Sequence, residues 1–131
     1  MSDDTLQVEL VAADRLVWSG EATMVIARTT EGDVGILPNH APMLSLMVDG
    51  VVDVQTTDGE TWIAAVDAGF LSVAHNRISV LSEHAEMAHD INLEKARQEL
   101  DRAKDHGEND DEAQAQVRRL EARVRAAEQA S

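Results

Sequence analysis

Between residues 30 and 44 the chain reads Thr30-Glu31-Gly32-Asp33-Val34-Gly35-Ile36-Leu37-Pro38-Asn39-His40-Ala41-Pro42-Met43-Leu44. Glycine favours tight turns, whereas proline fixes φ and is excluded from the interior of a helix. We therefore interpret this stretch as a rigid loop that connects two β-strands. The residues expected to shape the loop are Gly32, Gly35, Pro38 and Pro42. A loop of this kind is suited to presenting Asp33 and His40 to a partner.

The residues on both sides of this loop have the pattern of β-strands. Leu6, Val8 and Leu10 alternate with more polar residues, as in a half-buried strand. Further short apolar runs lie at residues 22–29, 44–48, 51–56, 61–66, 70–74 and 78–81. The dipeptides Asp49-Gly50 and Asp58-Gly59 indicate hairpins, and His75-Asn76 indicates a turn. Seven or more closely spaced strands predict a β-sandwich or flattened barrel, which we assign to residues 1–86.

Residues 87–131 have a helical pattern instead. Asn92 is a candidate N-cap, with Ile91 and Ala96 placed for a hydrophobic staple. Two apolar stripes follow at helical spacing, one formed by Leu93, Ala96, Leu100 and Ala103 and the other by Ala113, Val117, Leu120, Val124 and Ala127. We expect Gly107 to end the first helix and a polar turn at residues 108–111 to precede the second. The stripes hold few large side chains, so we expect this antiparallel hairpin to rest on the sandwich or on another protein.

Composition excludes several classes of function. The 131 residues include 25 acids and 11 bases, a formal net charge of −14, which argues against binding to nucleic acid or anionic lipid. The chain has no cysteine, so disulfides and thiolate catalysis are excluded. It has no apolar run long enough to span a membrane and no apolar segment of a signal peptide at its start. We expect a soluble, intracellular protein.

Catalytic motifs are absent from the sequence. It contains no phosphate-binding glycine loop, no nucleophile elbow and no His-Glu-x-x-His pair. His84 and His89 are five residues apart, which does not place them on one helix face, so we expect no metal site. A small hydrolase based on Asp33 and His40 would lack a nucleophile and oxyanion donors.

Three segments of the chain resemble the epsilon subunit of F-type ATP synthase. The stretch from Gly32 to Leu44 is similar to the family's signature. The family's Gly-Gly-Phe-Leu-x-Val strand is similar to Asp67-Ala68-Gly69-Phe70-Leu71-Ser72-Val73, in which Ala68 replaces the first glycine. The segment Val17-Trp18-Ser19-Gly20-Glu21-Ala22 also matches. The resemblance covers essentially the whole chain. It implies a β-sandwich of about ten strands followed by an antiparallel two-helix hairpin.

The resemblance implies a non-catalytic subunit of the central stalk, or rotor, that couples proton flow through the c-ring to ATP synthesis. Its implied partners are the gamma subunit, the c-ring and the catalytic alpha and beta subunits. It would lie at the cytoplasmic face of the plasma membrane, as a peripheral part of the complex. By resemblance, Asp33 and His40 touch the c-ring. The alternatives are turn capping by Asp33 and a structural hydrogen bond by His40.

The family's helical hairpin either folds onto the sandwich or extends into the catalytic hexamer and blocks ATP hydrolysis. In the extended state a basic cluster on the second helix would meet acidic surface of the catalytic subunits. That cluster is formed by Arg118, Arg119, Arg123 and Arg125. The alternative role is pairing within the helix, such as Glu121 with Arg125.

Some bacterial members bind ATP at the folded hairpin. Here Asn92 replaces the acid of their motif, and Lys95 replaces an arginine, whose guanidinium could form bidentate hydrogen bonds. Glu86 matches an upstream acidic position. The resemblance therefore implies at most a weak ATP site at Glu86, Asn92 and Lys95, and no cofactor.

A second interpretation comes from another class of protein. The chain could be a free-standing β-sandwich adaptor that dimerises through its two helical stripes and needs no gamma partner. Gel filtration distinguishes the two interpretations, because the adaptor would form a stable dimer.

Overall fold

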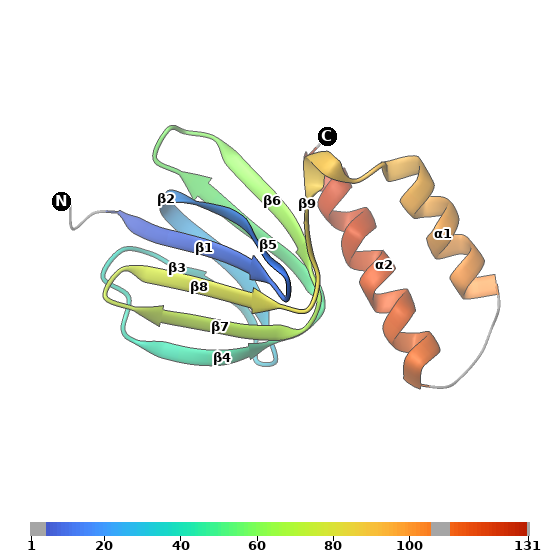
Figure 1. Cartoon of the computed structure of the whole chain (residues 1–131), viewed down its shortest axis with the longest axis horizontal. Coiled ribbons are helices and arrows are strands. Elements are labelled where there is room, and N and C mark those ends of the chain that lie inside the picture. The colour runs from blue at the N-terminus through green and yellow to red at the C-terminus, as the bar shows by residue number, and fades with distance from the viewer. Residues whose placement is uncertain (1–4, 106–110, 131) are drawn as a thin grey trace.

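Strands and helices occupy separate parts of the chain in the computed structural model, which describes residues 5–105 and 111–130. Figure 1 shows the strands stacked in two layers, with two helices at one end of the stack. The turn expected at Gly107 lies outside the described residues. The helices are α1 (Leu93–Asp105) and α2 (Asp111–Ala130), and α2 lies between α1 and the strands.

The described residues form nine strands, compared with about ten implied by the family resemblance. They are β1 (Leu6–Ala12), β2 (Arg15–Thr29), β3 (Gly32–Ile36), β4 (Met43–Met47), β5 (Gly50–Thr56), β6 (Thr61–Val66), β7 (Gly69–Ala74), β8 (Arg77–Ser82) and β9 (Ala85–Met87). Buried and exposed positions alternate along β1 and β8, as the period of two predicts. The N-terminal β-sandwich with a C-terminal pair of helices is thereby confirmed.

The long strand β2 joins the two layers. Its first half pairs antiparallel with β1, and its second half pairs with β5 and β3. Strand β1 also pairs in parallel with β8, so that the strands follow the order β1-β8-β7-β4-β2-β5-β6-β9. Strand β3 lies off this path and pairs with β2 alone among the described strands.

The interior of the sandwich is filled by aliphatic side chains from both layers. Leu6, Val25, Ile36, Leu71 and Ile78 are among the largest of them and are fully buried. They belong to one cluster, all of whose members come from the strands β1 to β9. The sandwich therefore has a core of its own, to which the helices do not contribute.

The helices follow the predicted stripes. The side chain of Asn92 caps α1, because its Oδ1 accepts a hydrogen bond of 3.0 Å from the backbone N–H of Lys95. Ile91 and Ala96 are both buried, as the hydrophobic staple predicts. Arg97 near the start of α1 pairs with Glu128 near the end of α2, so the two helices run antiparallel. A short 3₁₀ turn, η1 (Ala88–Asp90), connects β9 to this hairpin.

Two local predictions were wrong. The loop expected at Gly32–Pro42 begins with the strand β3, so Gly32, Asp33 and Gly35 lie in a strand and the loop itself starts after Ile36. Asp49-Gly50 does not form a hairpin, because β4 pairs with β7 and β2 whereas β5 pairs with β2 and β6. The turns at Asp58-Gly59 and His75-Asn76 do join paired neighbours, with positive φ at Gly59, His75 and Asn76.

Candidate functional site

The face of α2 that meets the sandwich carries small apolar side chains. Val124, Ala126 and Ala127 are buried in one cluster with Ile63 and Ala65 of β6. The stripe in the sequence predicted Val124 and Ala127 but missed Ala126, which lies on a neighbouring face of the helix. Alanine buries little apolar surface, so these contacts stabilise the docked helix only modestly.

Arginines of α2 pair with acids of the sandwich around this apolar contact. The Nε atom of Arg118 lies 3.8 Å from Oδ2 of Asp49, and the Nε atom of Arg119 lies 3.7 Å from Oδ2 of Asp67. Asp49 follows β4, and Asp67 follows β6. The sequence identified the arginines, but it did not identify these two acids as their partners in the docked hairpin.

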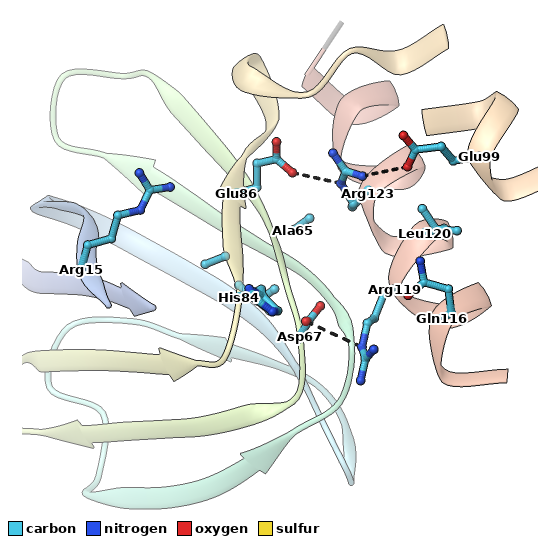
Figure 2. A pocket seen from close by; sticks show the side chains of 12 residues that line it. Arg15, Ala65, Asp67, His84, Glu86, Glu99, Gln116, Arg119, Leu120 and Arg123 are labelled. Atoms are coloured by element: carbon cyan, nitrogen blue, oxygen red, sulfur yellow. Dashed lines mark hydrogen bonds and ion pairs between the residues drawn. The ribbon is translucent and has the colours of Figure 1, made fainter. Parts of the chain in front are cut away.

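Arg123 connects three elements of the structure (Figure 2). Its Nε donates a hydrogen bond of 2.9 Å to Oε1 of Glu86 on β9, and its Nη1 lies 3.4 Å from Oε2 of Glu99 on α1. A guanidinium between two carboxylates makes charge-assisted hydrogen bonds to both. Arg123 thereby ties the sandwich, α1 and α2 together.

A cavity of about 340 Å³ lies between the end of the sandwich and α2 (Figure 2). Glu86 and Arg123 line it, together with Asp67, Arg119 and His84. Asn92 and Lys95 do not belong to its lining, and the side chain of Asn92 caps α1 instead. The three residues of the candidate ATP site are therefore not gathered around this cavity.

Burial raises the pKa of two aspartates near α2. Desolvation raises the pKa of Asp67, and the charge of Arg119 opposes this shift. Desolvation also raises the pKa of Asp53 on β5, whose buried Oδ1 has no hydrogen-bond partner among the described residues. A second cavity, of about 260 Å³, adjoins Asp53 and is also lined by Arg125 and Asp33.

Asp33 lies on the edge strand β3 rather than in a loop. Its Oδ1 lies 3.4 Å from Nε of Arg28 on β2, and both side chains are largely exposed. Turn capping is performed instead by Thr29, whose Oγ1 accepts a hydrogen bond from the backbone N–H of Glu31 and donates one to the carbonyl of Gly32. Gly32 has a φ of 112°, which suits glycine, whereas Gly35 occupies an ordinary strand position without a turn.

The loop that carries Pro38, His40 and Pro42 lies at the other end of β3. Asn39 has a φ of 70°. Its backbone N–H donates a 2.6 Å hydrogen bond to Oδ1 of Asn76, and this bond fixes the loop against the β7–β8 turn. The Nδ1 atom of His40 lies 2.7 Å from the carbonyl oxygen of Ala41. Figure 1 shows both connections, β3–β4 and β7–β8, at the end of the sandwich away from the helices.

Asp33 thus lies near the start of β3, whereas His40 lies in the connection that follows the end of this strand. No hydrogen bond or ion pair between them is found within residues 5–105 and 111–130. Among these residues the structure also holds no group of three His, Asp or Glu side chains placed to bind a metal ion. In the part of the chain that the structure describes, neither helix is long and apolar enough to cross a membrane.

Sequence reasoning missed an exposed apolar surface on the outer face of β4, β7 and β8. Leu46 of β4 lies opposite Phe70 of β7, and Phe70 lies opposite Leu81 of β8. Leu44 extends this row along β4 and is 73% exposed, whereas Phe70 is 49% exposed. The signal in the sequence is the presence of large apolar residues at outward positions, where strand alternation predicts polar ones. Contiguous apolar side chains on a protein surface mark interaction sites.

The comparison with known proteins agrees with these features. Residues 5–88 match the profile of the family described as "ATP synthase, Delta/Epsilon chain, beta-sandwich domain". The ATP synthase epsilon chain of Streptomyces avermitilis is 54% identical over 113 residues, which are 86% of this chain and 91% of that relative. The chain belongs to the epsilon-subunit family of ATP synthases.

Other members of the epsilon family show the same extent of likeness. The epsilon chain of Streptomyces griseus is 51% identical over 92% of this chain and 94% of its own length, and that of Rhodococcus opacus is 45% identical over 88% and 96%. A chain in the mitochondrial ATP synthase structure of Euglena gracilis has a TM-score of 0.74 at 22% identity, covering 95% of this chain and 78% of that one. At that identity the likeness concerns the fold.

The free-standing adaptor requires helical stripes that are open to a second copy. Ala96, Leu120 and Val124 are instead buried within the single chain. Within residues 5–105 and 111–130, the buried members of the stripes are covered by the rest of the chain, so in this conformation they are not open to a second copy.

Proposed function

We propose that this protein is a non-catalytic subunit of the ATP synthase rotor, which carries torque between a membrane-embedded c-ring and the catalytic hexamer. The observation that carries the proposal is the 54% identity with an epsilon chain along 86% of this chain. Such a role needs a stiff body with complementary surfaces, and the separate core of the sandwich supplies the stiffness. As part of this proposal, the protein lies on the cytoplasmic face of the plasma membrane as a peripheral part of the complex.

The exposed apolar surface formed by Leu44, Leu46, Phe70 and Leu81 is the proposed contact with the gamma subunit. Permanent subunits bury apolar cores of this kind, and their removal from water supplies most of the binding free energy. The edge from Asp33 through β3 to His40 is the proposed contact with polar loops of the c-ring. An exposed edge strand with charged side chains suits a polar partner.

The helical hairpin is the proposed regulatory domain, and residues 87–131 are its proposed extent. When extended, it would bring Arg118, Arg119, Arg123 and Arg125 to acidic surface of the catalytic subunits and so block ATP hydrolysis. The small apolar contact between α2 and β6 supports such mobility, because a weakly packed element is released easily. We propose no nucleotide site, since Glu86 is already paired with Arg123.

Affinity purification tests the proposal, with the full chain as bait against purified gamma subunit. We expect Phe70→Glu to abolish recovery of gamma, because a carboxylate at the centre of the apolar surface would be buried without a partner. Thr61→Glu, at an exposed position of β6, is the matched control and should leave recovery unchanged. Full recovery of gamma by the Phe70→Glu protein would exclude this surface as the contact.

A further inference from the structure

Three carboxylates face α2 although they come from three separate parts of the sandwich, two connections and one strand. Asp49 ends the β4–β5 connection, Asp67 lies between β6 and β7, and Glu86 lies in β9. Each pairs with a different arginine of α2, namely Arg118, Arg119 and Arg123. Figure 2 shows two of these pairs, Asp67 with Arg119 and Glu86 with Arg123, on the side of the helix that faces the strands.

We propose that Asp49, Asp67 and Glu86 form an acidic clasp that holds α2 on the sandwich and competes with acidic partner surfaces for the same three arginines. The competition rests on the proposed function, whereas the clasp itself does not. The carboxylates take the place that acids of the catalytic subunits would occupy. Docking of the hairpin on the sandwich and its binding to a partner then depend on the same three arginines.

Two of the three carboxylates are largely buried, and the sandwich holds one of them, Asp49, independently of the helix. The side chain of Asp49 is 10% exposed, and its Oδ1 accepts a 2.7 Å hydrogen bond from the backbone N–H of Ala68. The side chain of Asp67 is 19% exposed. The arginines are more exposed, at 59% for Arg118 and 45% for Arg119. In these two pairs the acid is the more buried partner, and Asp49, already fixed by the sandwich, loses little freedom when it binds the helix.

Charge can shift the position of the hairpin because the apolar contact between α2 and the strands is made mostly by small side chains. The apolar contact between α2 and β6 consists mainly of Ala126, Ala127 and Val124 against Ile63 and Ala65. Exposed ion pairs are individually weak, but several in one network act together. Because each arginine can serve one docking site at a time, a tighter clasp must weaken binding of the hairpin elsewhere by the same factor.

The clasp is tested on the full chain with the triple variant Asp49→Asn, Asp67→Asn, Glu86→Gln. The matched control is Asp14→Asn, Asp58→Asn, Glu60→Gln, which removes the same charge from exposed positions. The native sequence has no cysteine, so spin labels at Gln114→Cys on α2 and Arg77→Cys on β8 report one distance. We expect the released population to rise about tenfold in the triple variant, equivalent to about 1.4 kcal/mol. An unchanged distance distribution, equal to that of the control, would overturn the clasp.

Salt supplies a second measurement on the same labels. Raising ionic strength from about 0.02 M to about 0.5 M shortens the screening length several-fold and should release the hairpin of the parent chain. The triple variant should respond little, because its charges are already gone. An equal response in both proteins would show that the released charges lie elsewhere and would overturn the clasp.

A charge swap keeps the test decisive if the triple variant fails to fold. In a Glu99→Gln background, which removes the second carboxylate beside Arg123, Arg123→Glu should release the hairpin, and adding Glu86→Arg should restore the docked distance. Failure of the second substitution to restore docking would contradict the pairing.

Hydrolysis by the assembled ATP synthase separates the clasp from the proposed function. The triple variant should inhibit hydrolysis more strongly than the parent chain, because more of its hairpins are free to extend. Release of the labelled hairpin without any change in hydrolysis would leave the clasp intact and overturn the inhibitory role. Unchanged distances would overturn the clasp whatever the hydrolysis rate.

Discussion

At the scale of single residues, Gly69 occupies a position that no other amino acid fits. It begins β7, where a Cβ atom would collide with the backbone carbonyl oxygen of Leu81. Backbone atoms cannot move aside without breaking the β7–β8 pairing. Gly35 is a useful contrast, because nothing lies within 4 Å of the place its Cβ would take.

We therefore expect Gly69→Ala to lower the free energy of unfolding by about 3 kcal/mol. Gly35→Ala, the matched control, should leave stability unchanged or raise it by about 0.5 kcal/mol, because alanine restricts the unfolded chain. Urea denaturation followed by tryptophan fluorescence measures both. Equal stabilities of the two variants would contradict the close approach at Leu81.

Asp53 gives a prediction about pH. Burial raises the folded-state pKa of its carboxyl above the ordinary value of 3.8, so ionised Asp53 destabilises the fold at every pH above that raised pKa. The destabilisation fades as the pH falls through the folded pKa and is absent below 3.8. Asp53→Asn should therefore be more stable than the parent at pH 7 and equal to it at strongly acid pH. A stability difference that does not change with pH would contradict the assignment.

At the scale of elements, local pattern predicted strands well and their partners poorly. Alternation places the strands around Leu6 and Ile78 correctly, because burial on one face fixes a period of two. It cannot reveal that β1 and β8 pair in parallel, since their partners are 70 residues apart, as Val8 is from Ile78. The strand β3 was missed because Gly32 and Gly35 weaken its local signal, whereas its pairing with β2 stabilises it.

The same limit applies to the candidate site. The sequence identified Arg118, Arg119 and Arg123 because clustered charge is visible on a helical pattern. It could not identify Asp49 and Asp67 as their partners, because these acids look like ordinary turn residues in the sequence. Only folding brings the two turns beside α2. Long-range pairing, not residue type, is the information that one sequence lacks.

The N-cap of α1 provides a prediction at this scale. Asn92→Ala removes the 3.0 Å hydrogen bond to the backbone N–H of Lys95 and should destabilise α1 by about 1 kcal/mol. Hydrogen exchange should accelerate in the first turn of α1 and remain unchanged in the sandwich. Gln98→Ala, at an exposed position within α1, is the control and should not accelerate exchange, because alanine favours helix. Uniform acceleration across the chain would show that the cap stabilises the whole molecule instead.

At the scale of the whole molecule, two apolar clusters divide the chain between them. The first lies inside the sandwich and contains no residue of either helix. The second contains Ile63 and Ala65 of β6 together with residues of η1, α1 and α2. The sandwich can therefore keep its core without the hairpin, whereas the hairpin depends on the outer face of β6.

Deletion of residues 88–131 should consequently leave a folded sandwich. It removes η1, α1 and α2, uncovers Ile63 and Ala65, and leaves the interior cluster around Leu71 and Ile78 intact. Circular dichroism should retain the β-sheet spectrum with a cooperative thermal transition, and the fragment should recover gamma as well as the full chain does.

In the assembled ATP synthase, hydrolysis of ATP should rise, because the arginines of α2 can no longer reach the catalytic subunits. A folded fragment that binds gamma but leaves hydrolysis unchanged would remove the inhibitory role from the hairpin, and an unfolded fragment would show that the two clusters stabilise one another.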